Sequence, residues 1–198
     1  VAEHTVIGMS FSDFYALLDG INDAGVSCGI YMTYQGGETT VATDQDTEKP
    51  DFTSTTLLRL IAGLEAPQSG SVNVPKDLRI AFCFQEDRLL PFKTVIENVA
   101  LVSKDMEAAK HWIEKVGLSG EENAYPAALS GGMKRRASLA RALAYDAPVL
   151  LMDEPFRALD DETHAQMLAL VREAAKDKLL LLVTHDEADA CGMQEIRI

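Results

Sequence analysis

No hydrophobic run in this sequence is long enough to cross a membrane. A transmembrane helix needs roughly 20 consecutive apolar residues, and every apolar run in the 198 residues is much shorter. The first residues also lack the basic, apolar and small-residue succession of a secretory signal. We therefore expect a soluble protein, and its length is sufficient for one domain with a substantial buried core.

Cysteines and basic residues are both scarce. Cys28, Cys83 and Cys191 have neither the close spacing of a zinc site nor the even number of a disulfide framework. We therefore expect buried thiols in a reducing compartment. Lysine and arginine total 18 against 31 acidic residues, a net charge of −13, and the one basic cluster is Lys134-Arg135-Arg136. Because binding to a nucleic-acid backbone depends on clustered positive charge, no nucleic-acid partner is expected.

Apolar periodicity is clear from residue 57 onward. The pattern predicts helices at 57–64, 95–117, 138–145 and 161–176, and strands at 71–74, 79–84, 149–152 and 179–183. The last two strands are continuous apolar runs bounded by polar residues, as in a buried parallel sheet. The helix between them makes a βαβ unit, so the fold class is α/β.

The first 56 residues are less regular. Residues 6–11 and 26–34 are candidate strands, whereas residues 35–54 are rich in Gly, Thr, Asp and Glu and have no period. We interpret residues 35–54 as a long irregular loop. A loop of this length is uncommon in a compact domain, so the segment is either specialised or wrongly interpreted.

Two local patterns point to phosphate chemistry. Residues 129–133 read Leu-Ser-Gly-Gly-Met at the start of a predicted helix, and the strand at 149–152 is followed by Asp153, Glu154 and Pro155. A Gly-rich turn that opens a helix presents backbone N–H groups to an anion. Carboxylates are magnesium ligands. Together, the two patterns predict a site for a magnesium nucleotide.

With these motifs, residues 57–190 resemble the nucleotide-binding subunit of an ATP-binding cassette (ABC) transporter. The resemblance implies a P-loop NTPase-like parallel sheet core with an antiparallel β N-terminal part. It also implies one domain over residues 1–198, with a core lobe at 1–84 and 139–198 and an inserted helical lobe at 85–138. ATP and Mg²⁺ are the implied cofactors. The implied partners are a second ATPase subunit, paired head to tail in a homo- or heterodimer, and a transmembrane permease subunit, which would place the chain on the cytoplasmic face of the cell membrane.

The resemblance assigns roles to particular residues. Ser130, Gly131 and Gly132 match the signature turn, which contacts the γ-phosphate of ATP held by the opposite subunit. Asp153 matches the residue that holds Mg²⁺ through water. Glu154 matches the base that polarises the attacking water.

Three further residues match motifs in the same order. Asp160 lies in a match to the loop that couples the two ATP sites. His185 matches the switch histidine that contacts the γ-phosphate, although a lone histidine is more often inert. Gln85 matches the glutamine that reaches the metal and senses the membrane subunit. Residues 89–99 are most similar to importer subunits of the nitrate, sulfonate and taurine type, and Leu89, Leu90 and Phe92 are either a docking surface or lobe core.

The phosphate loop departs from the family pattern. Residues 56–63 match the helix that follows such a loop, and this register places Thr55 at the magnesium-binding hydroxyl and Thr56 beside it, both expected to contact the nucleotide. The same register places Glu48 and Thr53 where glycines belong and Ser54 where lysine belongs. No Gly-Lys pair occurs in the chain, although such a loop needs glycines to wrap the phosphates and a lysine to neutralise them.

Three hypotheses follow. The chain is an ABC ATPase subunit of a small-solute transporter, most simply an importer, whose own phosphate loop is impaired. Alternatively, it is a regulatory or structural partner whose signature turn completes the ATP site of a homologue with a sound loop. In the third case the first 56 residues no longer fold on the family plan. Hydrolysis by the isolated chain is expected to be weak or absent in each case.

Overall fold

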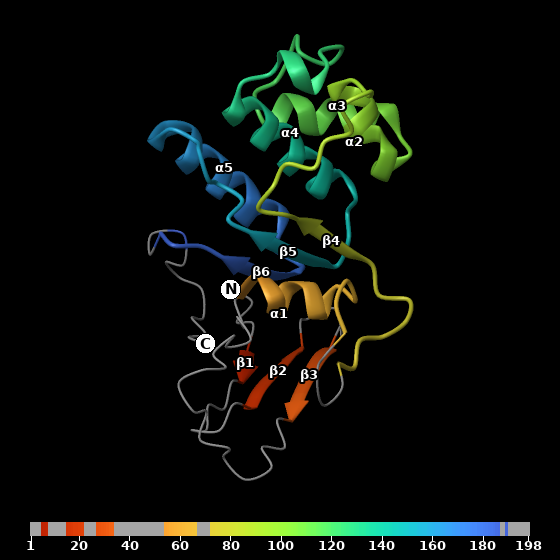
Figure 1. The fold of residues 1–198 in the computed structure, drawn as a ribbon, viewed down its shortest axis with the longest axis vertical. Coiled ribbons are helices and arrows are strands. Elements are labelled where there is room, and N and C mark those ends of the chain that lie inside the picture. Colours follow the sequence, from red (N-terminus) through yellow and green to blue (C-terminus); the bar gives the residue numbers. More distant parts are fainter. Residues whose placement is uncertain are drawn as a thin grey trace, which may run out of the picture. The chain divides into compact units, whose positions relative to one another are not determined.

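The structure is a computed structural model that describes residues 5–7, 15–21, 27–33, 54–66, 72–186 and 189, with side chains from Leu57 onward. The chain divides into two compact units, Val1–Leu78 with Gln194–Ile198, and Arg79–Met193. Figure 1 shows the helices and strands of both. The proposed site residues from Gln85 to His185 all belong to the second unit.

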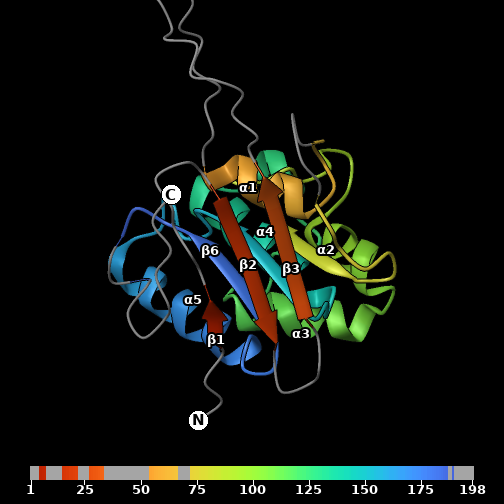
Figure 2. The ribbon, with the colours of Figure 1, turned by 90° about the horizontal axis from the view of Figure 1, so that it is seen from below.

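The first unit contains an antiparallel sheet of strands β1 (Thr5–Ile7), β2 (Tyr15–Ile21) and β3 (Ser27–Thr33), in that order. Strands β2 and β3 pair along their full length, from Tyr15 opposite Thr33 to Ile21 opposite Ser27, and lie side by side in Figure 2. The antiparallel N-terminal part is therefore confirmed. The predicted strand at 26–34 corresponds to β3, and the one at 6–11 is confirmed only for residues 6 and 7, because 8–11 lie outside the described residues.

Helix α1 (Ser54–Ile61) also belongs to this unit. It begins three residues before the predicted helix, and its end is marked by Gly63 at φ +68°, a conformation that glycine adopts without a steric cost. The predicted strand at 71–74 is wrong for residues 72–74, where Asn73 makes only an isolated bridge, and residue 71 lies outside the described residues. Pro75, which lacks an N–H group and so cannot extend a ladder, follows directly.

The second unit is built on a parallel sheet. Its strands are β4 (Ile80–Cys83), β5 (Val149–Asp153) and β6 (Leu179–Val183), with β5 in the middle and wholly buried. Helix α5 (Asp161–Ala174) connects β5 to β6 and makes the predicted βαβ unit. The prediction of an α/β fold with buried parallel strands is confirmed for β5, whereas the residues of β6 are only partly buried.

The helices of the second unit share one hydrophobic core with the sheet. Helix α4 (Gly131–Ala144) follows the short 3₁₀ helix η1 (Pro126–Ala128) and packs against α2 (Val95–Ser103), α3 (Met106–Lys115) and β4. Fully buried Val99, Ile113, Leu139 and Leu150 connect these elements. Cys83 lies in the same core, where burial raises the pKa of its thiol. The expectation of a buried cysteine is confirmed there, and the side chains of Cys28 and Cys191 lie outside the described residues.

The single helix predicted at 95–117 is two helices. Lys104 adopts a left-handed conformation at φ +55° and ends α2, and the carboxylate of Asp105 accepts a hydrogen bond from Glu107 N to begin α3. Apolar periodicity runs through both helices, so the break depends on this capping contact rather than on the hydrophobic pattern.

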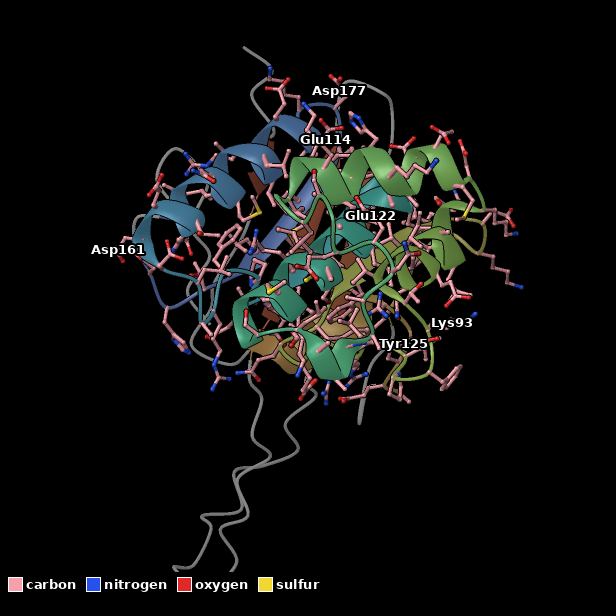
Figure 3. All side chains as sticks on the ribbon, turned by 90° about the horizontal axis from the view of Figure 1, so that it is seen from above. Lys93, Glu114, Glu122, Tyr125, Asp161 and Asp177 are labelled. Carbon is pink, nitrogen blue, oxygen red and sulfur yellow. The ribbon has the colours of Figure 1, made fainter. Side chains whose placement is uncertain are left out.

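Acidic side chains lie on the outside of the second unit. Glu114 on α3 and Asp161 at the start of α5 are exposed, as Figure 3 shows. No helix among the described residues is long and apolar enough to span a membrane.

Candidate functional site

The candidate site lies at the carboxyl edge of the parallel sheet. Asp153 is the last residue of β5 and is paired with Val183, the last residue of β6. Because parallel strands end at the same edge, the segments after β4, β5 and β6 meet there. These segments carry Gln85, the Asp153-Glu154 pair and His185, which sequence analysis had placed in one site.

Glu154 and His185 contact each other. Their Oε1 and Nε2 atoms are 2.6 Å apart, and the Glu154 side chain is 15% exposed whereas that of His185 is 90% exposed. The backbone N–H of Glu154 donates to Val183 O at 2.9 Å, which ties the two strand ends together. The pair therefore presents a partly buried carboxylate beside an imidazole open to solvent, an arrangement suited to holding a water molecule for proton transfer.

Asp153 differs from its neighbour in burial. The residue is 2% exposed, whereas the Glu154 side chain is 15% exposed. Asp153 is the last strand residue whereas Glu154 lies beyond β5 with a φ of +47°, so the two carboxylates have different surroundings. The oxygens of the Asp153 carboxylate and of the exposed Gln85 amide are the donor type that Mg²⁺ prefers, and the site's chemistry is therefore compatible with that ion.

The signature turn opens α4. Ser130 is the N-cap residue, and its hydroxyl oxygen accepts from Met133 N at 3.2 Å, which leaves the hydroxyl hydrogen able to donate outward. A Cβ placed on Gly131 would meet no described atom within 4 Å, and one on Gly132 would lie 3.6 Å from Ala158 O. The exposed turn thus offers backbone N–H groups at the positive end of a 14-residue helix, as a phosphate requires.

Asp160 caps its own helix. Its carboxylate accepts from Thr163 N at 3.0 Å and from Thr163 Oγ1 at 2.9 Å. These hydrogen bonds, led by the one from the Thr163 backbone, lower the pKa of Asp160. The side chain is therefore engaged locally, and the segment that it ends, Ala158–Asp160, approaches the signature turn at Gly132.

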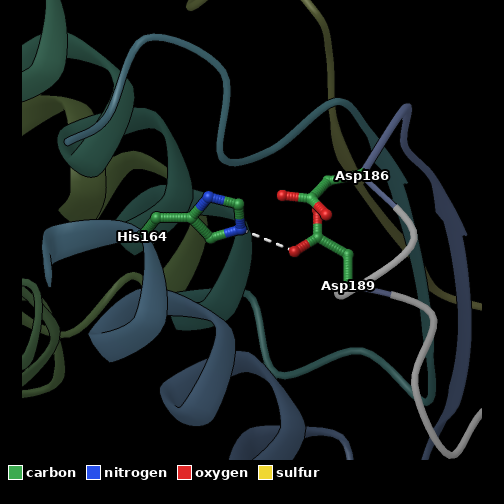
Figure 4. A group of neighbouring side chains, drawn as sticks. All are labelled: His164, Asp186 and Asp189. Carbon is green, nitrogen blue, oxygen red and sulfur yellow. Dashed lines mark hydrogen bonds and ion pairs between the residues drawn. The ribbon is translucent and has the colours of Figure 1, made fainter. Parts of the chain in front are cut away.

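A buried network holds the segment that carries His185. The carboxylate of Asp189, 2% exposed, accepts from Thr184 Oγ1 at 2.6 Å and lies 2.5 Å from His164 Nε2 on α5. Figure 4 shows His164 facing Asp189 with Asp186 beside them. Sequence analysis missed this network, because neither His164 nor Asp189 belongs to a pattern that distinguishes it from a surface residue.

Arg135 is a second residue that sequence analysis missed. It was interpreted as part of a short basic cluster, yet it is 3% exposed and donates to backbone carbonyls on both sides of the site.

The residues predicted to contact the nucleotide from the phosphate loop belong to the first unit. Thr55 and Thr56 lie in the first turn of α1, and their side chains are outside the described residues. Glu48 and Thr53 are outside the described residues altogether.

Comparisons of this chain with known proteins match ABC transporter proteins in each case. A family model described as ABC transporter matches residues 54–157, just over half of the chain. Curated relatives named aliphatic sulfonates import ATP-binding protein come from Paraburkholderia xenovorans (45% identical over 146 residues), Shouchella clausii (45% over 144) and Escherichia coli (43% over 152). Each match covers 71% of this chain, which spans 58–59% of the relatives' length.

Solved structures are similar as well. A dimeric ATP-binding cassette in a post-hydrolysis state bound to ADP and Pi is 28% identical, with a TM-score of 0.62, over 69% of this chain and 71% of that one. A dimeric bacterial ABC transporter cassette matches with the same identity and TM-score.

Proposed function

Because this chain belongs to the ABC transporter family, we propose that it is the ATP-binding subunit of an importer and that its own phosphate loop is impaired. The observation that carries the proposal is the contact between Glu154 and His185 at the edge where β5 and β6 end. The fold class, an α/β cassette of the P-loop NTPase type, is that of the similar solved structures. We further propose the lobe division at 1–84 with 139–198 and at 85–138.

In the proposed site the residues have distinct tasks. When bound, MgATP supplies the phosphoryl group and the metal charge that stabilises its transfer. Glu154 accepts the proton of the attacking water, and His185 orients the carboxylate through its 2.6 Å contact and reaches the γ-phosphate. Asp153 and Gln85 would hold Mg²⁺. The family resemblance assigns Thr55 and Thr56, which belong to the other unit, as further contacts of the metal and the phosphates.

The signature turn acts on a second nucleotide. Ser130, Gly131 and Gly132 donate to the γ-phosphate held by another ATPase subunit, and Asp160 lies in the segment that connects the two sites. The exposure of the turn and the open space at Gly131 support this role. It requires a head-to-tail dimer, and both similar solved structures are described as dimeric.

The missing Gly-Lys pair limits the chain's own site. Each charge-assisted hydrogen bond that the lysine and glycine amides would make contributes about 1.5–3 kcal/mol. Losing several of them weakens nucleotide binding by orders of magnitude, since about 1.4 kcal/mol corresponds to a factor of ten. Acidic residues such as Glu48 and Asp51 in the corresponding segment add charge of the wrong sign.

Isothermal titration of the isolated chain with MgATP tests this limit. We expect no binding in the micromolar range and no measurable steady-state hydrolysis. Micromolar affinity would show that residues 48–56 bind a phosphate without the usual lysine, and would contradict the proposal that the phosphate loop is impaired.

A second candidate is a regulatory partner that hydrolyses nothing itself. The intact Ser130 turn favours it, because a chain with a sound signature and an impaired phosphate loop completes one ATP site in a heterodimer. Mixing this chain with a homologous ATPase subunit that carries a Gly-Lys loop distinguishes the regulatory role from the catalytic one. Hydrolysis that appears only in the mixture and is abolished by Ser130→Arg supports the partner role, whereas hydrolysis by this chain alone supports the catalytic one.

The proposed solute is a small oxyanion, because the curated relatives are named for the import of aliphatic sulfonates. The proposed location is the cytoplasmic face of the cell membrane, on a permease subunit. Phe92 supports a docking role, since it is 71% exposed in the segment that follows Gln85. Leu89 and Leu90 beside it are partly buried, and Leu89 packs on the core.

A further inference from the structure

The guanidinium of Arg135 is saturated by hydrogen bonds to two separate turns. Its Nε donates to Pro155 O at 2.9 Å, and its Nη2 donates to Asp153 O at 2.9 Å and to Glu154 O. These three carbonyls belong to the turn that ends β5. The contacts hold the segment that carries the proposed base.

The other terminal nitrogen faces the turn after β4. Nη1 donates to Phe84 O at 2.6 Å and to Gln85 O at 3.2 Å, and it lies 3.5 Å from the carboxylate of Asp87. A guanidinium has five N–H donors in a rigid planar fork. All five are engaged here, and the two turns are therefore held at a separation set by one rigid group.

The conformation of Glu154 depends on its surroundings. Its φ of +47° lies in the left-handed region, which non-glycine residues rarely adopt unless neighbouring contacts hold them there. Its backbone N–H donates to Val183 O, and its carbonyl accepts from the Arg135 guanidinium and from Arg157 N–H at 3.2 Å. Arg135 thus helps hold the Glu154 backbone in this conformation, from which the side chain reaches His185.

Arg135 also lies on the helix that the signature turn opens. It is in the second turn of α4, five residues after Ser130. We propose that Arg135 is a positioning residue that joins the signature turn of this chain to its Gln85 and Glu154 turns, so that engagement of the signature by a nucleotide in the opposite subunit is transmitted to this chain's own site. The transmission step rests on the proposed function, because it requires a bound nucleotide. The contacts of Arg135 with the two turns do not depend on that function.

Arg141 provides a matched control on the same helix. It donates to Arg88 O at 2.8 Å and to Asp87 O at 3.0 Å, both in the segment after Gln85, and within the described residues it makes no hydrogen bond to the β5 turn. Both arginines therefore anchor α4 to the segment after β4, and Arg135 alone of the two also holds the turn after β5.

Hydrogen exchange of the full chain without nucleotide tests the junction. In Arg135→Gln, we expect exchange to accelerate at least tenfold in peptides covering both 84–88 and 153–157, with α5 unchanged. Arg141→Gln is expected to leave 153–157 unchanged. Arg135→Lys, which keeps the charge but cannot span both turns, is expected to fold and to lose protection at one turn or both. Wild-type exchange at both turns in the lysine variant, or equal acceleration across the whole chain in the glutamine variant, would overturn the proposal.

A second measurement tests transmission. MgATP and a homologous ATPase subunit with a Gly-Lys loop are added, and protection is followed at 129–133, 84–88 and 153–157. In the wild type and in Arg141→Gln we expect protection at all three segments, and in Arg135→Gln at 129–133 alone. Protection that persists at all three in Arg135→Gln would contradict the coupling. Absence of protection at 129–133 in every variant would instead contradict the proposed function, and the nucleotide-free measurement would still decide the junction.

Discussion

Two adjacent carboxylates at the end of β5 differ because of their surroundings. Asp153 is buried and belongs to the strand, whereas Glu154 has left the strand with a positive φ and reaches His185. Burial strengthens electrostatic interactions, so the inner carboxylate suits a metal and the outer one suits water. This division of tasks is a property of single residues and is testable one residue at a time.

Removing the charge of Glu154 tests its role as base. In any assembly in which this chain's own site hydrolyses ATP, Glu154→Gln is expected to lower kcat at least about 100-fold, the contribution typical of a general base. Nucleotide affinity should be unchanged, because the amide preserves the shape. Steady-state hydrolysis and nucleotide titration measure the two effects, with the exposed Glu162→Gln on α5 as control. Undiminished turnover in Glu154→Gln would show that another group is the base.

The cap of α5 makes a pH-dependent contribution to stability. The pKa of Asp160 is lowered from 3.8 by hydrogen bonds from the Thr163 backbone and hydroxyl. A carboxyl group with a lowered pKa in the folded state stabilises fully above its unfolded value and loses that stabilisation as the pH falls through the folded value. We therefore expect the free energy of unfolding to fall more steeply between pH 5 and 3 in the wild type than in Asp160→Asn. Urea unfolding across that range checks this, and the exposed Asp177→Asn (Figure 3) should keep the wild-type slope.

At the scale of elements, the junction of α2 and α3 shows how a short capping contact overrides periodicity. Thr94 and Glu97 form a capping box at the start of α2, and Asp105 caps α3 only two residues after α2 ends. Ser103 Oγ donates to Asp105 O at 2.9 Å and tightens the turn between them. Both helices can therefore pack on α4 within a short stretch of chain.

Relief of the left-handed conformation at this junction should stabilise the protein. Lys104 has φ +55°, where side chains are strained and glycine is not. Lys104→Gly is expected to raise the free energy of unfolding by about 0.5–1 kcal/mol, whereas Ser103→Gly, at the last residue of α2, is expected to lower it, because it adds backbone freedom to the helix and removes the hydroxyl bond to Asp105 O. Denaturant unfolding measures both changes. A loss of stability in Lys104→Gly would mean that the strain is offset by contacts of the lysine side chain.

At the scale of the whole molecule, the exposed Phe92 is the main side chain of the proposed permease contact. Phe92→Asp is expected to abolish recovery of the chain with its permease from detergent-solubilised membranes, because desolvated aromatic anchors dominate interfaces. Leu64→Asp, at a comparably exposed hydrophobic residue in the other unit, is the control. Both variants should keep the wild-type Tm, since neither side chain is buried. Equal recovery of Phe92→Asp and the wild type would place the permease contact elsewhere.

Much of the second unit was predictable from its sequence. The helix that opens at Gly131, the buried strand at 149–153 and the strand at 179–183 follow from a Gly-rich turn and from apolar runs, which are patterns within a short window. The break near Lys104 and the absence of an extended strand at the described residues 72–74 were not predicted, because a cap and a following proline outweighed the apolar pattern there. Family membership was predictable for the same reason as the strands: its motifs are contiguous stretches of sequence.

The sequence by itself determined the order of the motifs, the acidic charge, the α/β class and the lack of a Gly-Lys pair, because each is a property of residues close together in the chain. Only the tertiary structure decided that Glu154 contacts His185, that Asp189 holds His164 and Thr184, and that Arg135 is a buried junction rather than a member of a surface basic cluster. These contacts join residues that are up to 51 positions apart. The register of the parallel strands and the packing of α4 against them decide which residues meet across such distances. Neither can be read from a pattern within a short stretch of sequence.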